Sequence, residues 1–141
     1  RQEIIFQSKK LTIINDSKAT TFSSSASLLK SLTNVIWIVG GQAKSGDKLL
    51  LSKNNCKNIK AYLFGANVNF FKSKIKKLMK YESYQDLKSL VKKISLEIKL
   101  DKNKIHKTIL FSPSAASFDK FNNFEERGEY FNKLVKKYIN V

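Results

Sequence analysis

Apolar and polar positions along the chain form short blocks that predict strands and helices in turn. Two β-prone segments come first, Glu3–Phe6 and Leu11–Asn15, and the few polar residues between them indicate an antiparallel hairpin. The segment Val35–Val39 is an unbroken apolar run, which is typical of a central strand covered on both faces. Two further strands are expected at Ile59–Phe64 and Lys107–Phe111.

Four segments between or after these strands have the apolar spacing of helices. In the clearest of them, Leu87, Leu90, Val91 and Ile94 recur on one helical face, opposite a lysine-rich face. Because strand and helix alternate after the hairpin, we predict an α/β fold. Its Rossmann-like, mostly parallel sheet would be flanked by helices, with an N-terminal β-hairpin as an antiparallel edge. The helices are expected at about Ser23–Leu32, Val68–Met79 and Tyr84–Lys99, and from a cap at Ser117 or Asp119 to about Tyr138.

Length and composition are those of one folded domain. The 141 residues include one proline and five glycines, so no linker stands out. No apolar run approaches the roughly 18–20 residues of a membrane span. The single cysteine, Cys56, cannot form an intramolecular disulfide and is interpreted as a packing residue near a strand start. Because the chain begins without a start methionine, we expect it to be part of a longer protein.

The net charge of +16 allows two interpretations. A basic domain can bind nucleic acid, but the 27 basic residues include only two arginines, Arg1 and Arg127. Phosphate sites favour the bidentate guanidinium, and most lysines fall on predicted solvent faces. We therefore favour a general enrichment of lysine on the surface over a nucleic-acid-binding face. The nucleic-acid interpretation stays open. The only histidine, His106, is expected at the surface rather than in a metal site.

Polar turns follow three of the predicted strands. Asp16–Thr20 brings an acid, an amine and hydroxyls to the start of a helix, and Gly40–Asp47 contains two glycines and Lys44. Ser112–Ser117 consists mostly of small residues. An ordinary helix cap explains the first turn by itself, and the second turn lacks the spacing of a phosphate-binding P-loop. Because loops after parallel strands share one edge of the sheet, we expect all three to meet there and form a ligand site.

Three motifs in these turns together resemble one family. They read N-D-S-K-A-T at Asn15–Thr20, G-G-x-x-K at Gly40–Lys44, and S-P-x-x-A-S-F-D-x-F-x-N-F-E-x-R-G at Ser112–Gly128. With them, the chain from Arg1 to about Val135 resembles the C-terminal domain of the Mur ligase family, specifically the UDP-N-acetylmuramoyl-L-alanine–D-glutamate ligases. The resemblance implies that residues 1–141 are a single Mur ligase C-terminal domain, with the UDP-binding and central ATPase domains outside the chain.

The resemblance implies an enzyme of peptidoglycan precursor synthesis. In this family ATP phosphorylates the carboxylate of UDP-N-acetylmuramoyl-L-alanine, the amine of D-glutamate attacks the acyl phosphate, and ADP and phosphate leave. ATP and Mg²⁺ are therefore the implied cofactors, with the metal ligands in the central domain, so the chain alone is expected to be inactive. A cytoplasmic monomer without nucleic-acid or membrane partners is expected. The alternative interpretation is a basic, non-enzymatic module that binds nucleic acid or another polyanion.

The resemblance also assigns roles to individual residues. Asp16 matches a residue that contacts the ribose hydroxyls, and Arg1 matches an arginine that reaches the nucleotide phosphates. No metal ligand is expected in this domain, and the only catalytic contribution considered is an electrostatic role of Lys18. Thr21 departs from the family, which usually has asparagine there, and this puts the geometry of the helix cap in question. Six residues match the D-glutamate pocket: Lys18, Thr20, Lys44, Ser117, Phe118 and Phe124.

Overall fold

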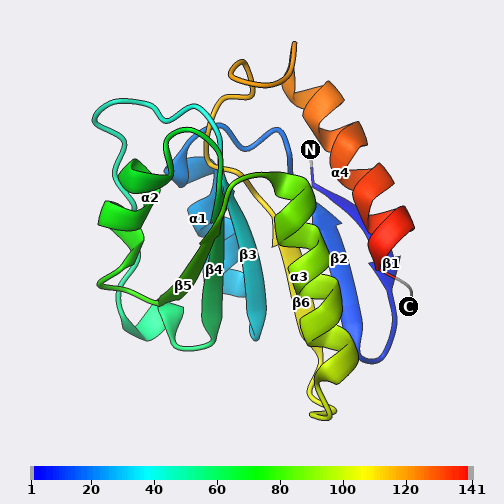
Figure 1. Cartoon of the computed structure of the whole chain (residues 1–141). Helices are drawn as coiled ribbons and strands as arrows, with labels where there is room; N and C mark the ends of the chain where they lie inside the picture. Colours follow the sequence, from blue (N-terminus) through cyan, green and yellow to red (C-terminus); the bar gives the residue numbers. More distant parts are fainter. Residues whose placement is uncertain (1, 140–141) are drawn as a thin grey trace.

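A six-stranded sheet flanked by helices forms the body of the protein, and the computed structural model describes residues 2–139 (Figure 1). The strands are β1 (Glu3–Gln7), β2 (Leu11–Asn15), β3 (Val35–Gly40), β4 (Ile59–Phe64), β5 (Lys80–Tyr84) and β6 (Lys107–Phe111). The helices are α1 (Phe22–Ser31), the 3-10 turn η1 (Asn54–Cys56), α2 (Val68–Ile75), α3 (Leu87–Leu100) and α4 (Phe124–Tyr138). The strand order is β1-β2-β6-β3-β4-β5, with β1 antiparallel to β2 and all other neighbours parallel. The predicted fold class is confirmed.

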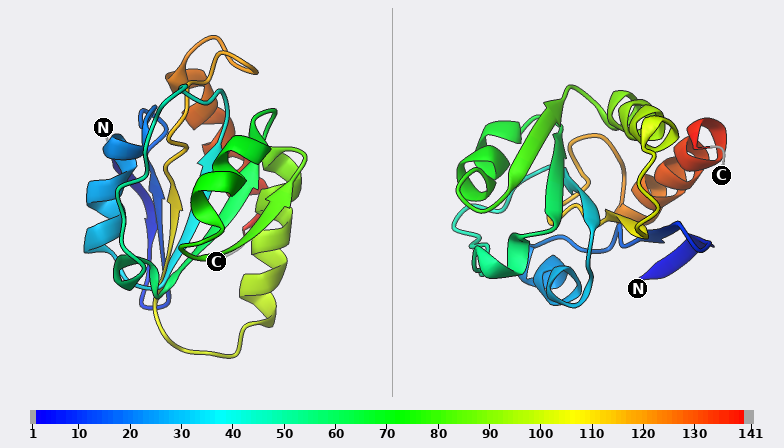
Figure 2. Two further views of the ribbon diagram at one scale, coloured as in Figure 1. Left: turned by 90° about the vertical axis from the view of Figure 1, so that its left-hand side faces the viewer. Right: turned by 90° about the horizontal axis from the view of Figure 1, so that it is seen from below.

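The core has two layers, because each face of the sheet is covered by two helices (Figure 2). Side chains alternate along β3. Trp37 and Val39 pack in the layer that contains the apolar residues of α1 and α2, whereas Ile38 packs in the layer of α3 and α4. A central strand with both faces buried explains why Val35–Gly40 reads as an unbroken apolar run.

Local sequence explains where the helices α1 and α3 begin. The Thr21 side chain accepts a hydrogen bond from the backbone N–H of Ser24 at 3.3 Å, and Asp86 accepts one from Ser89 at 2.8 Å. Each bond satisfies an N–H group that the helix itself leaves without a partner. Threonine therefore fills the cap position of α1 with an ordinary cap geometry.

The strand β5 was not predicted. Residues 80–83 fell in the gap between two expected helices, and Tyr84 was assigned to the second of them. The helix expected at Val68–Met79 ends at Ile75, and the helix expected at Tyr84–Lys99 begins only at Leu87. β5 lies at the edge of the sheet, and its side chains are exposed or half-buried. An edge strand with the sequence KYESY lacks the apolar run by which the central strands were predicted.

The start of the last helix was also predicted wrongly. Neither Ser117 nor Asp119 caps α4, because the chain forms turns there and the helix begins only after Asn123. The Asn123 side chain accepts a hydrogen bond from the backbone N–H of Glu126 at 2.8 Å. Asparagine followed three residues later by glutamate resembles a capping box, and this start signal outweighs the earlier serine.

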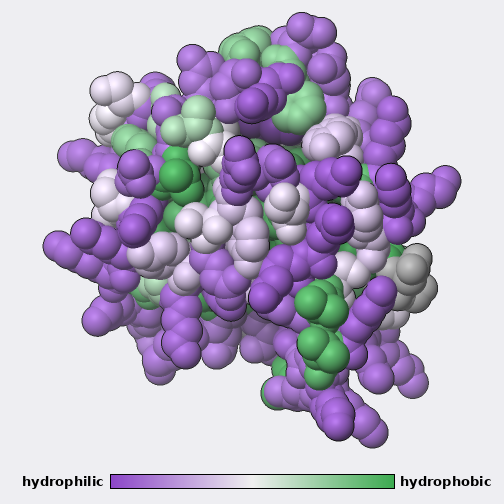
Figure 3. Space-filling view, in the orientation of Figure 1, coloured by the Kyte–Doolittle hydropathy of each residue, from purple (hydrophilic) through white to green (hydrophobic). Residues whose placement is uncertain are grey.

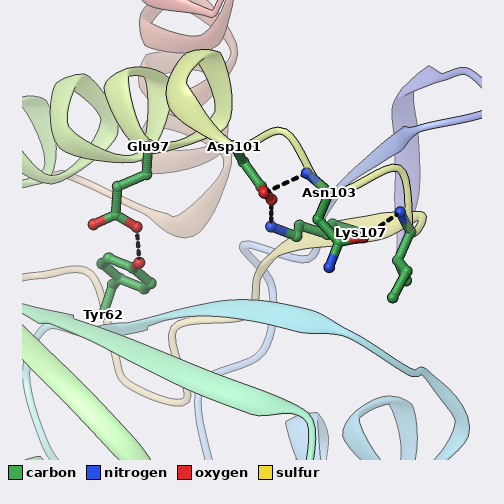
Figure 4. Close-up of polar contacts among 6 residues, drawn as sticks. Tyr62, Glu97, Asp101, Asn103 and Lys107 are labelled. Atoms are coloured by element: carbon green, nitrogen blue, oxygen red, sulfur yellow. Dashed lines mark hydrogen bonds and ion pairs between the residues drawn. The ribbon is translucent and has the colours of Figure 1, made fainter.

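Polar contacts fasten the C-terminal part of α3 to the sheet (Figure 4). The hydroxyl of Tyr62 on β4 donates to Glu97, and Lys107 at the start of β6 forms an ion pair with Asp101. Burial and the bond to Glu97 raise the pKa of Tyr62 far above its ordinary value. The Asp101 carboxylate also accepts the backbone N–H of Asn103 at 2.8 Å. The Lys107–Asp101 ion pair lies at the amino end of β6, away from the predicted ligand edge.

Candidate functional site

Three loops meet at the carboxyl edge of the sheet, because β2, β6 and β3 are neighbours. We call them the first loop (residues 16–21), the second loop (residues 41–47) and the third loop (residues 112–123). The backbone N–H of Asp16 donates to the carbonyl of Phe111 at 2.7 Å. Gln42 and Ala116 exchange two backbone hydrogen bonds of 3.0 Å and so join the second loop to the third. The predicted meeting of these loops is confirmed.

The first loop divides its side chains between the interior and the solvent. Asp16 and Ser17 are buried, Thr20 is half-buried and Lys18 is exposed. Lys18 borders a hollow of about 310 Å³ that Phe124 of α4 also lines. The first loop and the start of α4 therefore bring two of the predicted D-glutamate residues, Lys18 and Phe124, to one surface depression.

Asp16 is the acid of a buried hydroxyl network. Its Oδ2 accepts a hydrogen bond from Ser112 at 2.8 Å, and the hydroxyl of Ser25 lies 2.5 Å from that of Ser112 and 2.6 Å from that of Ser114. The indole N–H of Trp37 donates to the Ser112 carbonyl at 2.8 Å. Burial raises the pKa of Asp16, and the Ser112 hydrogen bond opposes that rise. Since Asp16 is only 2% exposed, a ribose hydroxyl could reach it only after local side chains moved.

The second loop is anchored at several points and leaves Lys44 exposed. The carboxylate of Asp47 accepts the backbone N–H of Phe22 at 2.8 Å, which ties the loop to the first turn of α1. Gly41 has a φ of +129°, and a Cβ there would lie 2.8 Å from the carbonyl oxygen of Ala116. Glycine is therefore required for the close approach of the second and third loops.

The remaining predicted residues differ in their access to solvent. Ser117 is 3% exposed, whereas Phe118 is 71% and Phe124 is 38% exposed. Within the described residues, two aromatic rings at one edge of the sheet thus remain exposed as apolar surface. Arg1, which the sequence assigned to the nucleotide phosphates, lies outside the described residues.

A second hollow of about 270 Å³ lies beside the loops and is lined in part by Gly41, Asp119 and Arg127. Thr20, Lys44 and Ser117 line neither of these two hollows. Lys44 is exposed, Thr20 half-buried and Ser117 buried, so the predicted D-glutamate residues do not all line one of these hollows. Figure 3 shows hydrophilic side chains over most of the visible face, with apolar groups in small separate areas.

Arg127 is a buried residue to which the sequence argument gave no role. Its Nε donates to the Ser17 hydroxyl at 3.1 Å, its Nη1 donates to the Ala115 carbonyl at 2.8 Å, and its Nη2 donates to the Ser17 carbonyl. Burial lowers the pKa of Arg127 to about 10, while the nearby Asp119 opposes that change. The guanidinium therefore remains charged at neutral pH and connects the first loop to the third.

Two other kinds of feature are absent from residues 2–139. No helix in that range combines the length and the apolar character that crossing a bilayer requires. No group of three or more His, Cys, Asp or Glu side chains in the same range is placed to hold a metal ion. His106 is exposed and lies 2.8 Å through its Nε2 from the Thr12 hydroxyl, and Cys56 is buried beside the start of β4.

Comparison with known proteins gives a consistent set of relatives. No protein-family model matches the chain. A UDP-N-acetylmuramoylalanine–D-glutamate ligase of Francisella philomiragia is 37% identical over 139 residues, which cover 96% of this chain and 32% of that protein. The ligase of the same name from Wolbachia sp. subsp. Brugia malayi is 37% identical, with 97% of this chain and 27% of that protein covered. The chain belongs to the Mur ligase family.

A third Mur ligase, the UDP-N-acetylmuramoylalanine–D-glutamate ligase of Prochlorococcus marinus, is 39% identical, with 100% of this chain and 30% of that protein covered. The chain therefore spans about 30% of the length of these relatives and corresponds to their C-terminal region. The resemblance stated from the three motifs is confirmed.

Two kinds of residue in the site were missed by sequence reasoning. Arg127 had a signal, because it is one of two arginines in a chain that otherwise uses lysine. Ser25 had none, and Ser112 was expected in the third turn but without a role, since the buried hydroxyl network joins residues that are 87 positions apart. Only the packing of α1 against the end of β6 brings these serines to Asp16.

Proposed function

We propose that this chain is the D-glutamate-binding and nucleotide-capping domain of an ATP-dependent amide ligase, in which D-glutamate is joined to UDP-N-acetylmuramoyl-L-alanine through an acyl phosphate. The observation that carries the proposal is the 35–39% identity of nearly the whole chain to D-glutamate ligases. The meeting of the three loops supports it, because the three motifs that resemble the family lie on them.

The donors on these loops suit the chemistry of D-glutamate, which has two carboxylates at neutral pH. Lys18 and Lys44 offer ammonium groups, Thr20 and Ser117 offer hydroxyls, and Phe118 offers a backbone N–H. Charge-assisted hydrogen bonds from such groups to carboxylates are shorter and stronger than neutral ones. Lys18 would also stabilise negative charge near the acyl phosphate.

The open arrangement of the donors suits a domain that closes over substrates held elsewhere in a longer protein. Lys18, Lys44 and the rings of Phe118 and Phe124 would lose contact with water on closure, which strengthens each electrostatic contact. In this proposal Asp16 contacts the ribose after a local opening of the serine network, and the Mg²⁺ ligands come from the central domain.

Substitution of Lys44 in the full-length enzyme tests the proposal. We expect Lys44→Ala to raise the KM for D-glutamate by roughly 10- to 100-fold, since it removes a charge-assisted contact worth about 1.5–3 kcal/mol. The KM for UDP-N-acetylmuramoyl-L-alanine should change little. Release of phosphate, measured while each substrate is varied in turn, gives both values.

Lys30→Ala is the matched control, because Lys30 is exposed and lies in the last turn of α1, away from the carboxyl edge of the sheet. Equal effects of the two substitutions would contradict the proposal. The chain alone should form no ADP in the presence of all three substrates. A steep salt dependence of nucleic-acid binding, spread over many lysines, would favour the alternative of a polyanion-binding module.

A further inference from the structure

Arg127 lies where all three loops of the site come together. Two of its donors reach Ser17 in the first loop and one reaches Ala115 in the third loop. A Cβ at Gly41 in the second loop would lie 3.4 Å from Nη1 of the same guanidinium. Arg127, which lies on α4, is thus next to the three loops that carry Lys18, Lys44 and Ser117. It lies outside all three loops.

The burial of this cation is costly and is not compensated by an ion pair. Arg127 is 1% exposed, and within the described residues the only ion pairs join Lys60 to Glu82 and Lys107 to Asp101. Hydrogen bonds to one hydroxyl and two carbonyls replace the water that the guanidinium has lost. Asp119 lies near enough to raise the pKa of the guanidinium but forms no ion pair with it in the described part of the chain. Burying a charged group without such a pair is unfavourable, so simple packing could be achieved better by an apolar side chain.

The backbone around Arg127 is shaped to let it reach the loops. Gly128 lies against the first loop, where an added Cβ would be 3.2 Å from the Cβ of Ser17. The side chain of Asn15 donates to the Gly128 carbonyl at 2.9 Å and accepts the backbone N–H of Ser17 at 3.1 Å. The Ser17 hydroxyl in turn donates to the Phe124 carbonyl at 2.7 Å. Ser17 is therefore held from several sides, with Arg127 as the link to the third loop.

We propose that Arg127 is a positioning residue for D-glutamate. It fixes the first and third loops against each other, so that Lys18, Thr20 and Ser117 keep one relative arrangement without contact between Arg127 and the substrate. Lysine cannot replace it, because a single ammonium cannot reach both loops with the planar fork of a guanidinium. This inference rests on the proposed function for its substrate, whereas the link between the loops can be tested independently.

The experiment uses Arg127→Lys in the full-length enzyme, which keeps the charge and removes the fork. We expect the KM for D-glutamate to rise about 10-fold, as for the loss of about one hydrogen bond to a charged group. The kcat should stay within about 3-fold and the KM for UDP-N-acetylmuramoyl-L-alanine should be unchanged. Lys133→Gln, an exposed change on the same helix, is the control and should leave all three values as they are.

Hydrogen exchange of the backbone amides supplies a readout that needs no activity. In Arg127→Lys, amides of residues 17–20 and 115–117 should exchange at least about 10-fold faster, while those of β4 keep their rates. A fall in kcat with unchanged KM values, or faster exchange throughout the protein, would mean that Arg127 has only a structural role and would overturn the inference. Unchanged exchange in the two loops would also overturn it.

A second variant covers the case in which Arg127→Lys does not fold. Ser17→Ala keeps the guanidinium and removes one of its acceptors, so the KM for D-glutamate should rise about 3-fold with faster exchange confined to the same two loops. If the parent enzyme shows no phosphate release that depends on D-glutamate, the proposed function fails, and the exchange rates still decide whether Arg127 links the loops.

Discussion

The hydrogen bond from Ser112 to Asp16 allows a test of how the buried network under the loops is stabilised. In Ser112→Ala the carboxylate Oδ2 loses a donor at 2.8 Å, and the Ser25 hydroxyl loses a neighbour at 2.5 Å. Asp16 is 2% exposed, so water cannot easily take the place of the missing hydroxyl. The change is small in volume, which keeps the effect of a new cavity low.

A buried polar group that loses its hydrogen-bond partner lowers the free energy of unfolding by about 1–3 kcal/mol. For a charged group the loss lies in the upper part of that range. We therefore expect Ser112→Ala to lower the free energy of unfolding at neutral pH by about 2 kcal/mol. For a domain of this length the melting temperature should fall by roughly 6–8 °C.

The loss should depend on pH, and its sign follows from the pKa of Asp16. Burial raises that pKa above its ordinary value of 3.8, and the Ser112 hydrogen bond lowers it. Asp16 therefore favours the folded state most when protonated, below the pKa of the unfolded chain, and this contribution is lost as the pH rises through the folded-state pKa. Without Ser112 the folded-state pKa rises further, so the destabilisation should be smallest in acid and grow toward neutral pH.

Unfolding in guanidinium chloride at a series of pH values measures this difference. Ser95→Ala is the control, because Ser95 is a buried serine whose hydroxyl donates to the backbone carbonyl of Tyr138 and has no carboxylate partner. Its cost should be about 1 kcal/mol at every pH between 4 and 8. A loss in Ser112→Ala that is equally independent of pH would refute the assignment of its effect to Asp16.

Two further predictions concern the elements that hold the loops in place. Phe131→Ala should lower the free energy of unfolding by about 3–5 kcal/mol in denaturant titrations, because the buried ring stacks on Phe111 with centroids 4.3 Å apart. Phe118→Ala, at an exposed ring, should cost less than about 0.5 kcal/mol, and equal losses would contradict the packing argument. Thr21→Ala should cost about 1 kcal/mol through loss of the α1 cap, and Thr21→Ser should restore most of it in thermal unfolding.

The sequence alone predicted most of the fold, because the deciding patterns are local. The strands Ile59–Phe64 and Lys107–Phe111 have the predicted bounds, and the hairpin and the alternation of strands with helices are as expected. The segment Lys80–Tyr84 was missed because an edge strand need not be apolar. The start of the last helix was misplaced because a serine at 117 and an asparagine at 123 give similar signals until the turn between them is known.

The sequence by itself also determined which three loops would meet, since loops that follow neighbouring parallel strands must share an edge. Tertiary structure decided what the residues of those loops do there. Asp16 has the sequence context of a polar turn residue, yet it is buried and accepts a hydrogen bond from Ser112, which lies 96 positions away in the sequence. Ser112 in turn contacts Ser25, from which it is separated by 87 positions. Arg127 reads as one more positive charge, yet it is the buried link between two loops, because burial and hydrogen bonding depend on which distant segments the packed sheet brings together.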